Sequence, residues 1–192
     1  MALQPLDAER SNPLGGGPSF PLSNRLLRAL WMLTWALLAS WTPPPLRAWR
    51  RFLLRTFGAT MAPGSDVRGT AKVWYPPHLH MDERALIGPR VNCYNMAPIR
   101  IGHDAIVSQG AHLCAGSHDI ASPAFQLTTR PITIGARAWI AAEAFVGPGV
   151  DVGEGVVLGA RGVAFRSLEP WGVYAGNPAK LIKHRELRQP GG

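Results

Sequence analysis

A six-residue period runs through the second half of the chain. Beginning at Ile101, an aliphatic residue recurs at every sixth position, and after one interruption the same spacing resumes at Ile134. A small residue such as Gly, Ala, Ser or Cys follows each of these positions. An earlier, weaker phase is offset from the main one by two residues and comprises Ile87, Cys93 and Ile99. The positions of the main phase are Ile101, Val107, Leu113, Ile134, Ile140, Val146, Val152 and Leu158.

This period excludes the common regular structures. An α-helix repeats every ~3.6 residues, and a strand alternates every ~2 residues between its two faces. A six-residue repeat instead suits a short strand followed by a bend, with three such units closing one triangular coil. The aliphatic side chains then fill the narrow core, and small residues fit the crowded bends. We therefore predict an all-β solenoid, a parallel β-helix, over residues 59–179.

The residues before the repeat have a different character. Residues 1–24 are rich in Gly, Pro, Ser and Asn, and we expect them to be flexible. Residues 25–58 are predicted to be helical, because a strongly apolar run over 26–41 is followed by Arg alternating with Trp, Phe and Leu. A 16-residue helix is only about 24 Å long, which is too short to cross a bilayer. Such a segment suits peripheral membrane contact or packing on the domain or on a neighbouring subunit, and the sequence leaves these alternatives open.

The net charge of +8 lies at the two ends of the chain. Residues 1–60 hold seven Arg against two acidic residues, residues 180–188 have a net charge of +3, and the middle is neutral. This distribution argues against a nucleic-acid partner, whose binding needs basic residues spread over a folded face. It suits an anionic membrane surface for the N-terminal segment and a phosphate-bearing ligand for the basic tail, residues 180–192.

The number and spacing of the cysteines indicate the redox state of the cellular compartment. The chain has two cysteines and no C-x-x-C motif. Two cysteines in a chain of this length form no disulfide framework, so we expect a reducing, cytoplasmic location. A peripheral position on the inner face of the cytoplasmic membrane is compatible with this expectation.

The interruption of the period contains the candidate for catalysis. Leu113 and Ile134 are 21 residues apart, so the 15 extra residues, 119–133, must leave the coil as a loop. His118 stands directly before this loop in the motif Gly-Ser-His-Asp at 116–119. Loops held by a rigid scaffold commonly carry function. An imidazole there is suited to act as a general base near neutral pH.

Residues 87–188 resemble the hexapeptide-repeat acetyltransferases. Within that family the chain is similar to the sugar O-acetyltransferases of exopolysaccharide (colanic-acid-type) biosynthesis, which are related to the maltose and galactoside acetyltransferases. The resemblance implies a left-handed β-helix, a homotrimer, and acetyl-CoA as acyl donor in the groove between adjacent β-helices. It is carried by the repeats and by GSHD at 116–119, PITIGARAWIA at 131–141, EPWGVYAGNPAKLIK at 169–183 and, before the repeats, WRRFLLRTFGA at 49–59.

The same resemblance implies roles for individual residues. His118 would remove the proton from the hydroxyl of a sugar or glycan acceptor, whose oxygen then attacks the thioester, and no metal is expected. The acceptor-binding candidates are Asn95 or Asn92, together with Asp119. Trp139 would line the donor site, and Lys180 and Lys183 would lie near the nucleotide phosphates. Backbone contacts to the pantetheine arm would come from Ala141, Gly159 and Ala160.

Three alternatives remain at this point. A β-helix zinc hydratase resembling γ-class carbonic anhydrases needs three converging histidines, for which His103, His112 and His118 are available. Their spacing does not match that family. A non-catalytic β-helix scaffold and an acetyltransferase acting on an amine are the other two.

Overall fold

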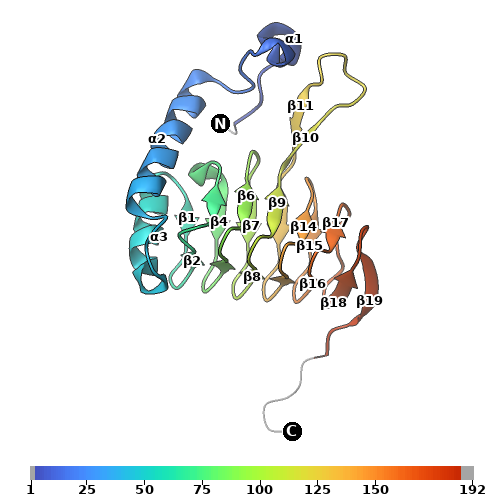
Figure 1. Ribbon diagram of the computed structural model, residues 1–192. Coiled ribbons are helices and arrows are strands. Elements are labelled where there is room, and N and C mark those ends of the chain that lie inside the picture. Colours follow the sequence, from blue (N-terminus) through green and yellow to red (C-terminus); the bar gives the residue numbers. More distant parts are fainter. Residues whose placement is uncertain (1–2, 187–192) are drawn as a thin grey trace.

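The computed structural model describes residues 3–186, which form a parallel β-helix with helices packed on its N-terminal end (Figure 1). The α-helices are α1 (Ala8–Ser11), α2 (Leu22–Leu38) and α3 (Arg47–Thr56). Short 3-10 turns occupy η1 (Pro13–Gly15), η2 (Pro44–Leu46) and η3 (Pro76–His78).

The solenoid has three parallel sheets, one on each side of the triangular coil. The first sheet contains β1 (Thr60–Met61), β4 (Leu79–Met81), β7 (Ile99–Ile101), β12 (Ile132–Ile134) and β15 (Asp151–Val152). The second contains β2 (Asp66–Val67), β5 (Leu86–Ile87), β8 (Ile106–Val107), β13 (Trp139–Ile140), β16 (Val157–Leu158), β18 (Gly172–Ala175) and the antiparallel edge strand β19 (Lys180–His184). The third contains β3 (Lys72–Val73), β6 (Asn92–Tyr94), β9 (His112–Cys114), β14 (Phe145–Val146) and β17 (Val163–Ala164).

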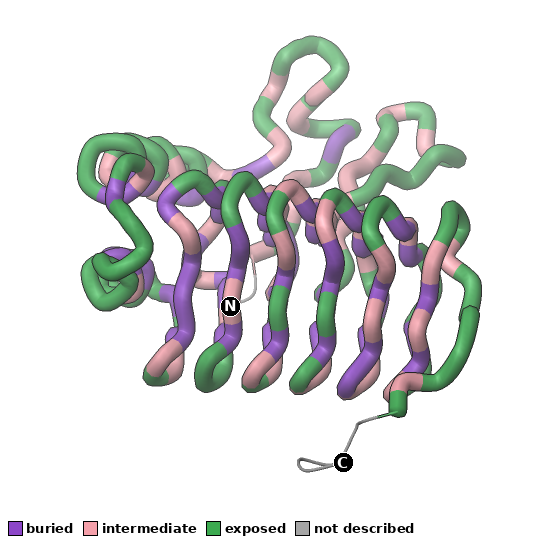
Figure 2. Tube along the Cα trace, turned by 60° about the horizontal axis from the view of Figure 1, so that its bottom comes forward, coloured by how far each residue is buried: buried purple, intermediate pink, exposed green. Residues whose placement is uncertain are grey.

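The predicted core is confirmed. All eight aliphatic residues of the main phase are at most 2% exposed. Figure 2 shows the buried positions recurring along every coil, as a six-residue period requires. The earlier phase is equally buried, since Ile87, Cys93 and Ile99 are 0% exposed. Burial in this apolar core raises the pKa of the Cys93 thiol to about 12, so Cys93 is a packing residue.

The two-residue offset between the phases has a structural cause. Asn92 pairs with His112, 20 residues further on, whereas Phe145 pairs with Val163, 18 residues further on. The early coils are therefore two residues longer than the hexapeptide repeat allows. Their extra residues, within 74–78 and 95–98, lie at the corner between the third and the first sheet. We call this the wide corner.

The extruded loop leaves the solenoid at the wide corner of the next coil. Its base is a two-stranded antiparallel hairpin formed by β10 (Gly116–His118) and β11 (Leu127–Thr129) (Figure 1). The excursion therefore begins at Gly116 and ends before Ile132, whereas the sequence predicted residues 119–133. As a result, His118 lies within the hairpin itself. The difference arises because antiparallel pairing extends the loop into strands, which a count of missing repeats does not register.

Both chain ends are more ordered than the sequence indicates. The segment expected to be flexible contains α1, and the amide N of Ala8 donates to Gln126 Oε1 of the hairpin at 2.7 Å. Gln126 Nε2 in turn donates to the carbonyl oxygen of Leu6 at 3.1 Å. Residues 180–184, expected to be part of a basic tail, form β19 against β18. Arg188 lies outside the described residues.

Helices α2 and α3 cap the first coil. A parallel coil at the end of a solenoid has no neighbour to pair with its backbone groups, and such edges must be covered. Here side chains of the two helices donate to the backbone carbonyls of residues 61–73. The bonds run from Trp31 Nε1 to Val73 O (2.7 Å), Trp35 Nε1 to Gly69 O (2.9 Å), Arg50 Nε to Val67 O (2.7 Å), Arg51 Nη1 to Ser65 O (3.3 Å) and Arg55 Nε to Met61 O (2.9 Å).

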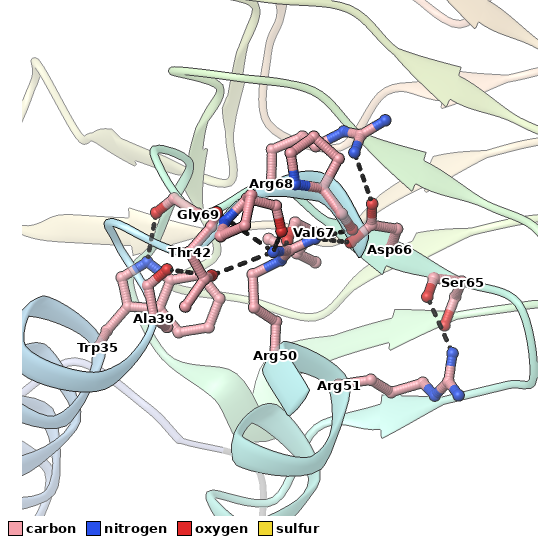
Figure 3. A network of polar contacts seen from close by, with 12 residues as sticks. Trp35, Ala39, Thr42, Arg50, Arg51, Ser65, Asp66, Val67, Arg68 and Gly69 are labelled. Carbon is pink, nitrogen blue, oxygen red and sulfur yellow. Dashed lines mark hydrogen bonds and ion pairs between the residues drawn. The ribbon is translucent and has the colours of Figure 1, made fainter. Parts of the chain in front are cut away.

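Arg50 is the centre of this cap and is fully buried (Figure 3). Its Nη2 lies 2.9 Å from Asp66 Oδ1, and its remaining N–H groups donate to oxygens of Thr42, Pro43 and Pro44. Arg50, Arg51 and Arg55 of α3 thus bind the solenoid, while Trp49 and Phe52 are exposed. Residues 25–58 therefore pack on the domain, which is one of the alternatives that the sequence left open, and the exposed outer face of the helices remains available for another contact. None of the described helices is long and apolar enough to cross a membrane.

Replacing Arg50 by Met should lower the free energy of unfolding by about 3–5 kcal/mol, because the buried Asp66 carboxylate keeps only Arg68 as a cationic partner and several backbone carbonyls lose their donor. Urea denaturation followed by circular dichroism measures the change. Arg47→Met is the matched control, since Arg47 is exposed in the first turn of the same helix; its effect should stay within about 0.5 kcal/mol. Equal stabilities of the two variants would contradict the capping role.

Candidate active site

His118 is held in a defined orientation by the hairpin. Its Nδ1 lies 2.8 Å from the carbonyl oxygen of Phe125, and its ring stacks on the Phe125 ring with centroids 5.0 Å apart. A carbonyl oxygen only accepts hydrogen bonds, so Nδ1 carries the proton of the neutral imidazole. Nε2 consequently has a free lone pair. The exposed His118 is therefore arranged to take up a proton at Nε2.

Asp119 contributes to the shape of the hairpin. Its Oδ1 accepts from the amide N of Ala121 at 2.9 Å, and its own amide N donates to Gln126 O at 2.8 Å. This side-chain-to-backbone bond two residues ahead is an Asx turn, which starts the loop after β10. Asp119 is exposed and adjacent to His118, but its Oδ1 is already engaged with the backbone.

Two clefts meet at His118. The N-terminal cleft has a volume of about 380 Å³ and lies between the N-terminal segment, α2 and the wide corner. The hairpin cleft, about 410 Å³, lies on the outer side of the hairpin. The N-terminal cleft is lined by Gly16, Gly17, Pro18, Ser19, Phe20, Arg25, Arg28, Trp74, Tyr94, Met96, His118 and Leu127. The hairpin cleft is lined by Ser117, His118, Asp119, Thr128, Arg130 and Pro148.

The N-terminal cleft is basic and aromatic. The guanidinium of Arg28 lies 4.2 Å above the ring of Trp74, and its Nε donates to Asn24 Oδ1 at 3.0 Å. Burial, together with the nearby charge of Arg25, lowers the pKa of Arg28 from its usual value. Burial also raises the pKa of Tyr94, which keeps its hydroxyl neutral. The sequence did not predict a role for the cleft residues Arg25, Arg28, Trp74 and Tyr94. The two-residue offset between the phases does mark the corner at which the two aromatic residues lie.

The two asparagines predicted to bind the acceptor lie away from His118. Asn95 is fully buried, and its amide makes two hydrogen bonds to the backbone of Tyr75 in the preceding coil, at 2.9 and 2.8 Å. It tethers the wide corner and lines neither cleft. Asn92 lies in a separate apolar groove beside α2, where its Nδ2 is 3.2 Å from His112 Nε2. Neither asparagine lines a cleft that contains His118 within one chain, and their acceptor role stays a prediction.

The other histidines do not assemble a metal site. Burial lowers the pKa of His112, and its Nε2 accepts from Asn92, so the ring is neutral. His103 Nδ1 bonds instead to Asp104 Oδ2 at 3.0 Å. Within residues 3–186, no group of three or more His, Cys, Asp or Glu side chains is arranged to hold a metal ion. The geometry gives no support to the zinc hydratase alternative.

The residues expected to bind the acyl donor lie on or beside the second sheet. Trp139 is 47% exposed on β13, and its Nε1 donates to Ser108 Oγ at 2.9 Å. Across successive strands Trp139 pairs with Val157, Val157 with Val173, and Val173 with Lys183 on β19. Neighbouring strands are ~4.8 Å apart, so this ladder places Lys183 about 14 Å from Trp139 along the sheet. Lys180 is exposed on the same edge strand.

Two of the three residues predicted to contact the pantetheine arm use their backbone N–H groups within the chain. The amide N of Ala141 donates to Leu158 O at 2.9 Å, and that of Gly159 donates to Tyr174 O at 2.8 Å. Both N–H groups therefore already donate to carbonyl oxygens of the next coil. Ala160 is exposed at the corner that follows the second sheet.

One chain does not bring the base and the donor face together. His118 leaves the solenoid at the wide corner, between the third and the first sheet, whereas Trp139 lies on the second sheet. In a triangular coil, that corner is opposite the second sheet. Figure 1 shows the hairpin and strands β18 and β19 on opposite sides of the solenoid.

Solved structures of hexapeptide-repeat acetyltransferases have the same fold as this chain. A maltose O-acetyltransferase from Clostridium difficile 630 has a TM-score of 0.73 at 20% identity, covering 87% of this chain and 90% of that one. A hexapeptide-repeat acetyltransferase from Vibrio cholerae, solved with acetyl-CoA, has a TM-score of 0.75 at 19% identity, covering 85% and 88%. The fold is thus the left-handed parallel β-helix expected from the resemblance.

A sequence relative identifies the family. The Escherichia coli (strain K12) protein named "Putative colanic acid biosynthesis acetyltransferase WcaF" is 41% identical over 162 residues, which is 84% of this chain and 89% of the relative. No family model matches the chain. The protein belongs to the colanic-acid-type family of hexapeptide-repeat acetyltransferases, and it is an acyltransferase enzyme. The family resemblance stated from the sequence is confirmed.

Replacing Asn95 by Ala should lower the free energy of unfolding by about 1–3 kcal/mol, because buried backbone groups of Tyr75 lose their partners. The KM for a sugar acceptor should not change. Urea denaturation and saturation kinetics measure the two quantities. Asn92→Ala serves as the control, since it removes one partly exposed hydrogen bond and should cost less. If Asn95→Ala instead raises the KM for the sugar acceptor and leaves the free energy of unfolding unchanged, Asn95 binds the acceptor.

Proposed function

We propose that the protein transfers the acetyl group of acetyl-CoA to a sugar hydroxyl during exopolysaccharide biosynthesis of the colanic-acid type, with His118 as general base. The observation that carries this proposal is the bond from His118 Nδ1 to the Phe125 carbonyl, which leaves Nε2 able to accept a proton where two clefts meet. The family relationship supports the acyl donor and the acceptor class.

The transfer is direct. Nε2 of His118 accepts the proton of the acceptor hydroxyl while the oxygen attacks the thioester carbonyl carbon. The carbon–sulfur bond then breaks, and the sulfur leaves with the proton returned from the imidazolium. The Phe125 carbonyl holds the ring throughout and stabilises the charged form, because it accepts a hydrogen bond from the adjacent N–H. A thioester is already activated, so orientation and proton removal are the main tasks of the chain.

The donor occupies the second sheet of a neighbouring protomer in a homotrimer. Because His118 and Trp139 are on opposite sides of one chain, a site containing both requires two chains. Trp139 covers the pantetheine arm, Ala160 offers its exposed backbone at the corner, and the lysines of β19 bind the nucleotide phosphates as point charges. Asp119 borders the hairpin cleft and contributes to acceptor binding there.

A sugar hydroxyl is favoured over an amine as the acceptor. An alcohol must lose its proton as it attacks, which gives the free Nε2 a function. An amine that is already unprotonated depends less on such a base. The dependence of the two reactions on His118 therefore separates the alternatives.

The outer face of the cap contacts a membrane surface at the cytoplasmic side. Large apolar side chains are exposed along α2 and continue onto the turn after it and α3. A contiguous exposed apolar ridge of this kind favours an interface with lipid or protein. Its members are Leu22, Leu26, Leu30, Leu33, Leu37, Trp41, Trp49 and Phe52.

His118→Ala should reduce kcat for acetyl transfer to a sugar by about 100-fold or more, because general-base help is lost. The affinity for CoA, measured by titration calorimetry, should stay near the wild-type value. His80→Ala is the control, since His80 lies on β4 and lines neither cleft. Full activity of His118→Ala toward sugars would exclude the base. An equal loss with an amino sugar would show that both acceptors need it.

Leu30→Glu and Leu33→Glu should each reduce binding of the full-length protein to vesicles containing anionic lipid, because a charge on the ridge must be desolvated at the interface. Co-flotation of protein with vesicles measures this. Leu14→Glu provides a control outside the ridge, since Leu14 is similarly exposed on the N-terminal segment. Failure of the wild-type protein to float would count against membrane contact without affecting the transfer reaction.

A further inference from the structure

The N-terminal cleft contains two cationic side chains that lack a carboxylate partner. Arg25 is exposed and Arg28 half-buried, and both line the cleft together with His118. Neither forms an ion pair with an acidic side chain of residues 3–186. The residues that line the cleft include no Asp or Glu. In contrast, the arginines at the centre and edge of the helical cap all donate to protein oxygens.

Electrostatic repulsion opposes the arrangement of the Arg25 and Arg28 guanidinium groups. They are three residues apart on α2 and therefore lie on the same face, where like charges repel. Arg28 is also held in place, because Asn24 Oδ1 accepts from its Nε and its guanidinium packs over Trp74. The neighbouring charge of Arg25 is one cause of the lowered pKa of Arg28. A bound anion would relieve this repulsion.

The surroundings of the arginines suit a sugar that carries an anion. Tyr94 lines the cleft beside Trp74, whose ring is covered by the Arg28 guanidinium, and Tyr94 offers an aromatic surface against which the apolar side of a sugar ring can pack. His118 lines the same cleft as the two arginines. A sugar that binds there with its anionic group at the arginines therefore lies in the cleft that also contains the imidazole.

We propose that Arg25 and Arg28 form an acceptor subsite for an anionic group, a phosphate or a carboxylate, carried by the glycan. This inference rests on the proposed transfer to a sugar and specifies the acceptor further. Guanidinium groups bind both anions through paired, charge-assisted hydrogen bonds. The N-terminal segment and α2 thus set acceptor specificity, in addition to capping the solenoid.

The test measures binding directly on the full-length protein. Titration calorimetry with galactose, galactose 1-phosphate and galacturonate, each in the presence of CoA, compares a neutral sugar with the two anionic sources. At least one anionic sugar should bind about tenfold more tightly than galactose, the gain expected of charge-assisted hydrogen bonds. The stronger of the two identifies phosphate or carboxylate as the preferred group.

Variants assign the effect to the arginines. Arg25→Gln should abolish the preference for the anionic sugar while leaving galactose binding unchanged, and since Arg25 is exposed the fold should be retained. Arg28→Lys keeps the charge but loses the planar fork, so it should retain part of the preference. Arg47→Gln removes an exposed arginine outside the cleft and should behave as the wild type. Equal binding of all three sugars, no binding of any, or a preference that survives Arg25→Gln would overturn the subsite.

A parallel assay of acetyl transfer separates this inference from the proposed function. CoA release with each sugar reports the transfer reaction. If anionic sugars bind as expected but no sugar is acetylated, the subsite stands and the transfer proposal fails. If charged and neutral sugars are acetylated with equal KM, and Arg25→Gln changes neither, the transfer proposal stands and the subsite fails.

Discussion

The end of a parallel solenoid leaves a full coil of backbone carbonyls without strand partners, and the structure depends on how this edge is covered. At the N-terminal end the cover consists of side chains, with Arg50, Trp31 and Trp35 donating to the first coil. At the C-terminal end it consists of backbone, because β19 folds back against β18. The side-chain cover at the N-terminal end also positions part of the candidate site. Anchoring α2 by its two indoles fixes the direction of the helix, and its N-terminal turns then lie beside the hairpin that carries His118.

The wide corner connects this cap to the site. In the first two coils the corner is enlarged by two residues, and in the third it expands into the whole hairpin. Asn95 holds successive corners together through the backbone of Tyr75, and Trp74 and Tyr94 of neighbouring coils pack edge to face beside it. The corner thus supplies both the wall of the N-terminal cleft and the strands that orient the imidazole. A loop extruded from a regular 18-residue coil would lack this lateral support.

The sequence reveals those features that follow from one-dimensional spacing. The period identifies the core residues from Ile101 to Leu158, and its interruption identifies His118. The sequence does not reveal where a side chain points once helices dock. Arg50 and Arg28 occur in similar Arg-rich, apolar surroundings, yet one is buried against Asp66 and the other faces a cleft. Asn95 illustrates the same limit, because whether an amide binds a ligand or the backbone of a neighbouring coil depends on contacts 20 residues away. The two-residue offset between the two phases of the period was the sequence signal that could have revealed the wide corner.

A triangular coil has a further consequence for catalysis. Because each corner faces away from the opposite sheet, a hairpin leaving the wide corner can reach the donor face of another chain but not that of its own. In the proposed homotrimer the contact would be heterologous, joining the hairpin of one protomer to the second sheet of the next, and such contacts close into a ring when the rotation between protomers permits. Three-fold closure would give three equivalent sites, each with one His118 and one Trp139 from different chains. The acceptor side of each site would still come from a single chain, because the N-terminal cleft and the base belong to the same protomer. On this proposal, acceptor selection would be a property of the protomer fold, whereas the meeting of acceptor and donor would be a property of the assembly.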